Sequence, residues 1–396
     1  MRKLVFCIAL ILCLVLIVPV AWSCSETEEE NTFVKLLTLL PETARKGRVI
    51  ILIDYESFRK ANGIFLYDED NQRLTNEEFR DTIMNLSMDG NLFGEHILLY
   101  GSYWTGLKDD ILSSPIQDSN IGYSITDVNA EINNIYSVSL SSSGIGSLGS
   151  NLDALVAAVG NFDTLSTEQA LNNRDKWPLW AIDNFKSEEC EKITIYSWGD
   201  SLEFHLANRR NPPHLDEIGR AVPLAVSNGQ LFIGSSTEDI KSAIDSSMDK
   251  APSLADLPEY LLIAQGMHYL NTIEIIIVDE LLIRDILASA ESYYGTKLEN
   301  FTTIGMGHGK DDNGEYMALV IVFENQEYAE ESVPLLEQRI EAYNKLYKMN
   351  FRYEEHLIYD TEISIDDKVL QAKLYTDDEL LWRRWFFNEL PIMYQE

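Results

Sequence analysis

Three glycines in the stretch Ser142–Gly160 have the spacing of a dinucleotide-binding loop. Gly144, Gly146 and Gly149 form a literal G-x-G-x-x-G. This pattern holds a pyrophosphate when a strand precedes it and a helix N-terminus directly follows it, because the first amides of the helix point at the phosphates. The helix requirement is the weak point, since the next segment, LDALVAAVG, carries valines and ends in glycine. We therefore favour a Ser/Gly-rich connecting loop over a nucleotide site and expect no cofactor.

A second glycine-rich stretch, GMGHGKDDNG at residues 305–314, has a partial match to a phosphate-binding P-loop. A P-loop needs Ser or Thr after its Gly-Lys pair, because that hydroxyl binds Mg²⁺. Here Lys310 is followed by Asp311, whose carboxylate would repel a phosphate. A hairpin turn around Asp312-Asn313-Gly314 is the better interpretation.

The segment DEDNQRLTNEEF begins like a calcium-binding loop, with Asp68 and Asp70 at its first and third positions. An EF-hand loop needs glycine at position 6 and a bidentate glutamate at position 12. Arg73 and Phe79 stand at those positions. We expect no metal site of this type.

The remaining residue types that could do chemistry show no catalytic spacing. The six histidines occur in neither an H-E-x-x-H nor a zinc-binding pattern: His96, His205, His214, His268, His308 and His356. No serine occupies a G-x-S-x-G elbow. A triad built from distant residues stays open, because such groups meet only in the fold. We interpret the lone Cys190 as a small buried apolar residue rather than a nucleophile.

The N-terminus has the order of an export signal. The basic residues Arg2 and Lys3 precede an apolar run, Leu4–Trp22, and small residues then surround a cleavage site before Cys24. We expect residues 1–23 to be a signal peptide. Every form of this segment, cleaved or uncleaved, places the remainder of the chain outside the cytoplasm.

The four residues AWSC resemble a bacterial lipobox, in which the cysteine carries diacylglycerol. The fit is imperfect, because Ala21 stands where Leu is usual and Trp22 is bulky. We expect lipidation of Cys24, with an acidic tether over residues 24–33. The alternatives are an uncleaved transmembrane anchor, since the run is long enough to span a bilayer, and free secretion.

Charge and cysteine content limit the partners of the exported part. The formal net charge is −33, from 64 acidic and 31 basic residues, which disfavours nucleic acid and electrostatic binding to an anionic membrane. Cys7 and Cys13 lie in the signal segment. If Cys24 is acylated, Cys190 has no intramolecular partner, so the fold must be stable without disulfides.

The first half of the chain alternates strand-like and helix-like segments. RVIILID (Arg48–Asp54) predicts a strand and the following YESFRKA a helix. Thr75 and Glu78 form a capping box that opens another helix. Further strands are predicted at His96–Gly101 and Lys192–Trp198.

The segment from residue 221 to 244 predicts a hairpin followed by a helix. Two apolar strands flank Asn228-Gly229, the pair typical of two-residue turns. Ser235 and Glu238 fit a capping box for a helix with Ile240, Ala243 and Ile244 on one face.

A second unit begins near His268. It contains a strand at Ile273–Val278, a helix at 279–294, a hairpin at 302–323, a helix with an apolar face over 329–343, a hairpin at 363–375 and an aromatic helix at 378–394. Pro334 interrupts the apolar face, so that helix kinks or begins close to it. These elements predict an α+β fold of two related units, with mixed or antiparallel sheets built from hairpins and covered by helices. We expect the domains to span residues 34–267 and 268–396.

Several of these segments resemble a group of uncharacterised bacterial exported proteins and lipoproteins of a domain-of-unknown-function type. Chains of that group show LLP before a strand ending in Asp, then G-[DN]-F-D, then a hairpin with G-S-S-x-E-D-[IV]-K and a helix. The matching segments lie within Leu39–Ile340: LLPETARKGRVIILIDYESFRKANGI, ALVAAVGNFDTLSTEQAL, PLAVSNGQLFIGSSTEDIKSAI, PSLADLPEY and YAEESVPLLEQRI.

The resemblance implies an α+β body outside the membrane. It also implies that LDALVAAVG is a strand that runs into a helix at LSTEQAL, which leaves the preceding glycines as a connection between strands. It carries no enzymatic activity over to any residue.

We therefore expect a membrane-tethered extracytoplasmic lipoprotein that binds or scaffolds without a catalytic site, on the outer face of the cytoplasmic membrane. Its partners would be the membrane, through its anchor, and another envelope protein or a small solute. The alternative is a cell-envelope hydrolase with a dispersed active site. His, Asp and Ser side chains converging in one deep pocket would favour the hydrolase, and an apolar patch would favour a protein partner.

Overall fold

The computed structural model describes residues 31–45, 48–67, 72–88, 93, 122–123, 125–136, 155–175, 179–198, 223–279, 300–350 and 357–376. Several predictions lie outside these residues. They are the signal peptide with Cys24, the glycines of the G-x-G-x-x-G stretch, the strand at His96–Gly101, the helix at 378–394 and the helix at 279–294 apart from Asp279, which is strand.

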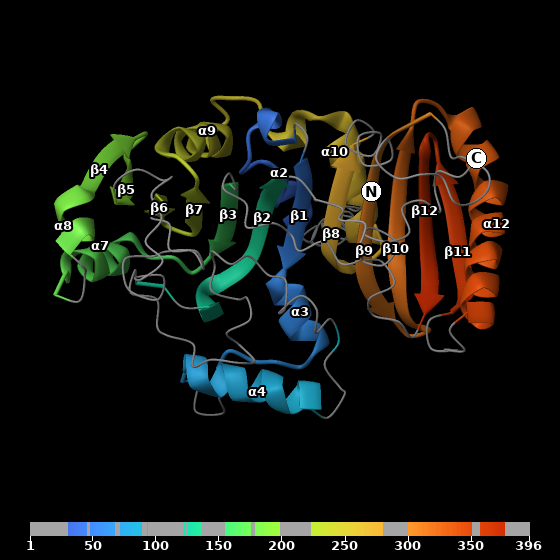
Figure 1. The fold of residues 1–396 in the computed structure, drawn as a ribbon, viewed down its shortest axis with the longest axis horizontal. Helices are drawn as coiled ribbons and strands as arrows, with labels where there is room; N and C mark the ends of the chain where they lie inside the picture. Colours follow the sequence, from blue (N-terminus) through green and yellow to red (C-terminus); the bar gives the residue numbers. More distant parts are fainter. Residues whose placement is uncertain are drawn as a thin grey trace, which may run out of the picture.

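The described strands form one twelve-stranded sheet in which every neighbouring pair is antiparallel (Figure 1), which confirms the α+β class. From one edge to the other the order is β11 (Ile358–Asp366), β12 (Val369–Thr376), β10 (Gly314–Phe323), β9 (Phe301–Asp311), β8 (Thr272–Asp279), β1 (Arg48–Asp54), β2 (Val128–Tyr136), β3 (Leu155–Gly160), β7 (Gln230–Gly234), β6 (Leu224–Ser227), β5 (Ile193–Trp198) and β4 (Phe185–Cys190).

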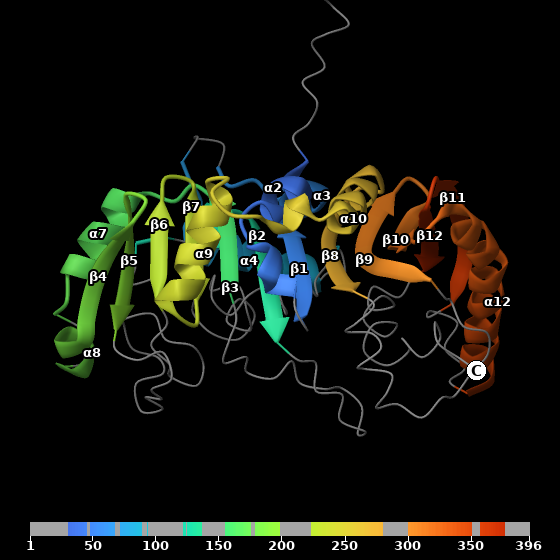
Figure 2. The same cartoon turned by 90° about the horizontal axis from the view of Figure 1, so that it is seen from above.

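Helices cover both faces of the curved sheet (Figure 2). One face packs against α2 (Thr32–Leu37), α9 (Thr237–Ser247) and α10 (Pro258–Tyr269). The other face packs against α3 (Tyr55–Ala61), α4 (Asn76–Met88), α7 (Thr164–Asn172), α8 (Leu179–Asn184) and α12 (Gln326–Asn350). Each face has its own apolar core, since alternate residues of a strand point to opposite faces.

The two halves of the sheet have the same topology. Strands β1 and β8 pair at the centre, and from this seam the order is β1-β2-β3-β7-β6 on one side and β8-β9-β10-β12-β11 on the other. In each half the first three strands follow one another, and a later hairpin then adds its second strand next to the third. The pair β4–β5 is an addition at the outer edge of the first half.

Residue pairing repeats the same symmetry. At the seam Ile51 lies opposite Ile276, and the flanking pairs, Ile50 with Ile277 and Leu52 with Ile275, are exchanged by a two-fold rotation about that point. Both halves also have a bulge at the corresponding position. It lies between β2 and β3 at the end of β3, and between β9 and β10 at the end of β10. The shared topology agrees with two related units, while the domain boundary at 267/268 stays a prediction.

Most local predictions in the described residues are confirmed. The capping box is present, with Glu78 N donating to Thr75 Oγ1 and Thr75 N donating to Glu78 Oε2. The segment after the glycines is strand β3, which runs into α7 as the family resemblance implied. Pro334 lies inside α12, which begins eight residues earlier in the chain at Gln326.

The cap of α9 is a correction. We expected Ser235 with Glu238, but the capping residue is Ser236, whose Oγ accepts from Asp239 N at 3.2 Å. Strand β7 ends at Gly234 and the backbone is still extended at Ser236, with φ −143 and ψ 160, so the helix begins at Thr237. The predicted helix face is confirmed, because Ile240, Ala243 and Ile244 are buried.

Candidate functional site

A hollow of about 840 Å³ opens at one end of the central strands, where β1 ends and β8 begins. Neighbouring antiparallel strands run in opposite directions, so the end of one strand lies beside the start of the next, and residues far apart in sequence meet there. Its lining combines polar and apolar residues from strand ends, hairpin tips and helices α2, α3 and α10: Thr32, Phe33, Lys35, Asp54, Glu56, Ser57, Lys60, Ala61, Phe93, Asn129, Ala130, Val159, Gly160, Asn228, Gly229, Gln230, His268, Asn271, Thr272, Ile273 and Lys310.

The balance of charge in this hollow is opposite to that of the whole chain. The side chains that can carry positive charge are Lys35, Lys60, His268 and Lys310. Only Asp54 and Glu56 among the lining residues are acidic, although acidic residues outnumber basic ones by 64 to 31 in the chain. Amides of Asn129, Asn228 and Asn271 add hydrogen-bond donors. The lining therefore suits an anionic group with additional acceptors.

Asp54 and Ser57 form the N-terminal cap of α3. Asp54 Oδ1 accepts from the Ser57 amide at 2.9 Å, and Oδ2 accepts from Ser57 Oγ, also at 2.9 Å. The bond from the Ser57 amide satisfies a backbone N–H that the first turn of the helix leaves unpaired. The carboxylate therefore serves the helix cap, and both of its oxygens already accept hydrogen bonds.

The tip of the β6–β7 hairpin forms one rigid wall. Gly160 N donates to Gly229 O and Gly229 N donates to Phe162 O, both at 3.1 Å, so the tip is fastened to the end of β3. Gly229 has φ +85, a left-handed conformation that glycine adopts without strain. The predicted Asn228-Gly229 turn thus places a glycine backbone and an asparagine side chain at the site.

The opposite wall carries an ion-paired lysine. Lys310 Nζ lies 3.2 Å from Glu315 Oε1, and the buried His308 has its Nε2 3.6 Å from Oε2 of the same carboxylate. Burial alone would raise the pKa of Glu315, but His308 and then Lys310 outweigh it and hold that pKa below its ordinary value. His308 also contacts the Phe93 ring, with centroids 4.7 Å apart.

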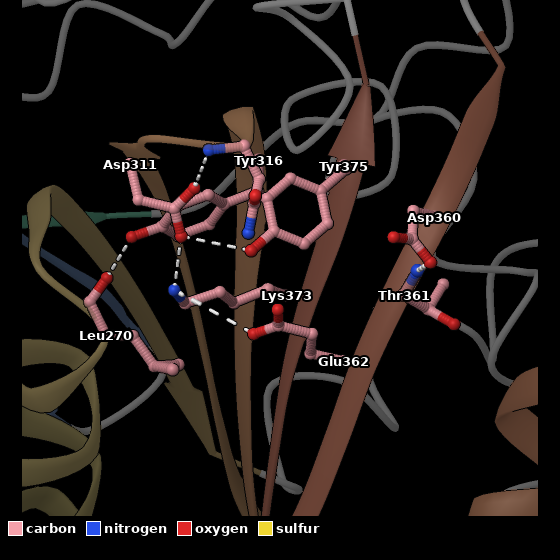
Figure 3. A network of polar contacts seen from close by, with 9 residues as sticks. Leu270, Asp311, Tyr316, Asp360, Thr361, Glu362, Lys373 and Tyr375 are labelled. Atoms are coloured by element: carbon pink, nitrogen blue, oxygen red, sulfur yellow. Dashed lines mark hydrogen bonds and ion pairs between the residues drawn. The ribbon is translucent and has the colours of Figure 1, made fainter.

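A polar network fastens the β9–β10 turn to β12 beside this wall (Figure 3). Asp311 Oδ2 accepts from Lys373 Nζ at 2.5 Å and from Tyr375 Oη at 3.0 Å. Tyr316 donates its hydroxyl to Leu270 O, and Lys373 Nζ lies 4.7 Å from the Tyr316 ring centroid. Each group stabilises a neighbour in the fold, so we assign the network to structure.

The glycine-rich stretch next to Lys310 is the strand and turn that we expected, and its glycines have a packing role. Gly305, Gly307 and Gly309 lie on one face of β9, where an added Cβ would collide with α10, with the β8 backbone and with Tyr316 respectively. A flat strand surface is therefore needed for α10 and the Tyr316 ring to lie close.

Other residues singled out in the sequence serve the fold. Arg73 pairs with Asp127 at 2.6 Å, and Phe79 is 3% exposed in the core; Asp68 and Asp70 lie outside the described residues. Cys190 ends edge strand β4 and is half-buried, not fully buried as we expected. Burial and then the Asp245 carboxylate raise the pKa of its thiol, which disfavours a nucleophilic thiolate.

Of the histidines, the structure brings only His268 to the lining of the hollow, and His308 lies buried behind it; the other four lie outside the described residues. Sequence reasoning missed Lys60, Asn129 and Asn271, because no motif marks them. The available signal was their position next to strand ends, because polar residues at the ends and starts of neighbouring antiparallel strands lie together once the strand order is known.

Within the part of the chain that the structure describes, no group of three or more His, Cys, Asp or Glu side chains is placed to hold a metal ion. None of the described helices is both long enough and apolar enough to cross a membrane.

Comparisons with known proteins give a distant likeness in fold. No family model matches the chain, and no curated protein matches it. The solved structure of TP0453 in crystal form I is similar with a TM-score of 0.37 and 7% identity, covering 91% of this chain and 98% of that chain. Crystal form III of TP0453 gives a TM-score of 0.37 and 8% identity over 87% and 95% of the two chains. At these values the likeness carries no argument about function.

Proposed function

We propose that this chain is an extracytoplasmic lipoprotein, tethered to the membrane through Cys24. In this proposal it binds an anionic solute, without chemical conversion, in the hollow where β1 ends and β8 begins. The export signal and the AWSC sequence support the location. The single observation that carries the binding function is the cationic, amide-rich lining of the hollow in a chain of net charge −33.

The size and rigidity of the hollow support a small ligand. Its volume of about 840 Å³ lies in the range of solute-binding pockets, roughly 300–1,000 Å³. The surrounding potential of an acidic protein is unfavourable to anions, so a local reversal of charge gives selectivity for ligands that reach this position. The hydrogen bonds that fasten the hairpin tip mean that the wall is formed before the ligand arrives.

The hydrolase alternative has less support. His268, Asp54 and Ser57 do line the same hollow. However, Ser57 donates its hydroxyl to Asp54 at 2.9 Å as part of a helix cap. In a catalytic triad the serine hydroxyl donates to the histidine, and the aspartate accepts from the other ring nitrogen. The arrangement in α3 is that of a structural cap.

The test is anion binding by the full chain in a mild detergent. Inorganic phosphate and sulfate are titrated by calorimetry, and the melting temperature is followed with increasing phosphate. A ligand that binds only the folded state stabilises it by about 2.7 kcal/mol at 100 times its Kd, which raises the melting temperature by several degrees.

Variant Lys60→Gln removes one positive charge from the hollow, and Lys345→Gln removes one from the exposed surface of α12 as a matched control. We expect Lys60→Gln to weaken phosphate binding by about three- to tenfold, because a charge-assisted hydrogen bond is lost. We expect Lys345→Gln to bind like the wild type. Equal behaviour of the two variants, or no phosphate binding at all, would overturn the proposal.

A further inference from the structure

Asn129 stands at an irregularity of the sheet beside the hollow. Val128 pairs with Gly160, and Ala130 pairs with Val159. Asn129 is therefore the extra residue of the bulge between β2 and β3. A bulge re-aims the side chain of its extra residue out of the regular alternation, and bulges are frequent next to functional sites. Asn129 lines the hollow from this position.

A buried arginine holds the Asn129 side chain. Arg59 of α3 is 6% exposed, and its Nη2 donates to Asn129 Oδ1 at 2.9 Å. Its Nη1 donates to Val128 O, also at 2.9 Å. A guanidinium can only donate hydrogen bonds, so the Asn129 atom that faces Arg59 must be the oxygen. The fold therefore determines which end of the amide is left for the hollow, and that end is the NH₂ group.

The NH₂ group of Asn129 is available to a ligand. Among the described residues its Nδ2 has no hydrogen-bond partner. This group can only donate, whereas the oxygen of an ionised oxyanion accepts, so the two are complementary.

The charge of Arg59 favours the same class of ligand. Burial lowers the pKa of Arg59 more than the nearby carboxylates of Glu56 and Asp54 raise it. The guanidinium nevertheless stays charged, and it makes no ion pair with another described residue. Arg59 therefore adds positive potential beside the Asn129 amide.

The second half of the sheet provides a comparison within the same chain. Its corresponding bulge lies between β9 and β10, where Phe323 pairs with Phe301 and Val322 with Thr303. Thr302 is therefore the extra residue there. Its Oγ1 donates to Val322 O at 3.2 Å, so this side chain binds the neighbouring strand. A bulge at this position does not by itself present a donor to a ligand, so the contact with the buried arginine is an additional feature of the first half.

We infer that Asn129 is an anion-binding residue of the hollow and that Arg59 is the positioning residue that presents its NH₂ group to the anion. This inference rests on the proposed function and names two residues that carry it out. Lys60 supplies charge to the site, whereas Asn129 supplies a hydrogen bond of fixed direction. A donor that is already oriented loses less freedom on binding, which favours affinity.

The first experiment measures binding of inorganic phosphate by calorimetry to the full chain in detergent, for Arg59→Lys, Asn129→Ala and the double variant. Lysine keeps the positive charge but cannot hold both oxygens in the planar geometry of the guanidinium. We expect each single variant to weaken phosphate binding by about three- to tenfold. In the Asn129→Ala background Arg59→Lys should have no further effect, because Arg59 acts through the amide.

A merely structural Arg59 would give a different result. Arg59→Lys would then lower the melting temperature and leave the Kd for phosphate unchanged. Wild-type affinity in either single variant, or an equal loss from Arg59→Lys in both backgrounds, would overturn the inference.

Asn129→Asp gives a second test that does not depend on replacing the buried arginine. The new carboxylate still accepts from Arg59 but has no N–H to donate. Asn325→Asp is the matched control, since Asn325 is exposed, does not line the hollow and also accepts a bond, from Tyr328 N. We expect Asn129→Asp to melt at or above the wild-type temperature and to bind phosphate more than about tenfold more weakly than Asn325→Asp. Equal phosphate binding by the two variants would refute the role of Asn129.

The two proposals fail in different ways. If phosphate binding depends on Lys60 but not on Asn129, the anion site stands and this inference is wrong. If phosphate does not bind, or if Lys60→Gln has no effect, the proposed function fails, and this inference fails with it.

Discussion

Gly309→Ala tests how closely β9 and the Tyr316 ring are packed. Gly309 lies opposite Tyr316 in the β9–β10 pairing. An added Cβ would lie 2.5 Å from Tyr316 Cζ and 2.6 Å from its hydroxyl oxygen, whereas such atoms normally pack at about 3.5 Å. The Tyr316 ring is fully buried and donates its hydroxyl to Leu270 O, so it must move by about 1 Å and weaken that bond.

The expected cost follows from three contributions. Overpacking a buried site costs about 1–3 kcal/mol, loss of a buried hydrogen bond costs about 1 kcal/mol, and replacing glycine with alanine returns about 0.5 kcal/mol through the unfolded chain. We expect Gly309→Ala to lower the free energy of unfolding by about 1.5–3.5 kcal/mol. Tyr316→Phe, which keeps the ring and removes the hydrogen bond, should cost about 1 kcal/mol.

The assay is urea unfolding of Gly309→Ala, Tyr316→Leu and the double variant. If the clash is the cause, removing the ring makes room for the new methyl group. The double variant should then be more stable than the sum of the single effects predicts, by at least about 1 kcal/mol. Additive effects, or a loss below about 0.5 kcal/mol for Gly309→Ala alone, would show that the ring is not held as tightly as the structure indicates.

Three further predictions concern an ion pair, a helix cap and the anchor. Burial would raise the pKa of Asp311, but Lys373 outweighs it and lowers that pKa; the stability from Asp311 is therefore present above its unfolded pKa of about 3.9 and is lost as pH falls through the folded value. Burial would lower the pKa of Lys373, but its bond to Asp311 raises it, so its contribution is lost only as pH rises through the folded value. The stability difference between wild type and Lys373→Met, measured by urea unfolding across pH, should thus be largest at neutral pH and shrink in acid; a constant difference would contradict the pairing. Ser236→Ala should lower stability by about 1 kcal/mol through loss of the α9 cap, and Ser236→Thr should retain it; equal melting temperatures of the two variants would argue against the cap. Cys24→Ala should lose both signal processing and incorporation of a lipid label in cell fractionation, and a variant that keeps both would end the lipoprotein proposal.

Local patterns were sufficient for most elements of the fold. The strand Arg48–Asp54 is a continuous apolar run because it lies at the centre of a sheet covered on both faces, and its Asp54 marks the start of α3. Asn228-Gly229 predicted the hairpin from a pair common in two-residue turns, and Gly229 takes the positive φ of +85 that favours glycine there. The cap of α9 was displaced by one residue, since a serine pair offers two registers and strand length decides between them.

The candidate site could not be predicted in the same way. Lys60, His268 and Lys310 meet only because β1 pairs with β8 and β8 with β9, and no local spacing encodes that order. The Ser57–Asp54 pair shows the opposite case. A sequence search for triads would count both residues as candidates, whereas their short separation makes them a cap.

The seam between β1 and β8 has a consequence for the order in which the chain folds. A chain is made from its N-terminus onward, and its N-terminal parts fold first. Strand β8 begins at Thr272, long after β1 ends at Asp54. Until then β1 is an apolar strand with one unpaired edge, which is a template for pairing with other chains. In the finished protein the second half covers that edge. A chain that ends before Thr272 would therefore carry an open edge and associate with copies of itself through β1, in the pairing that β8 provides within the complete chain.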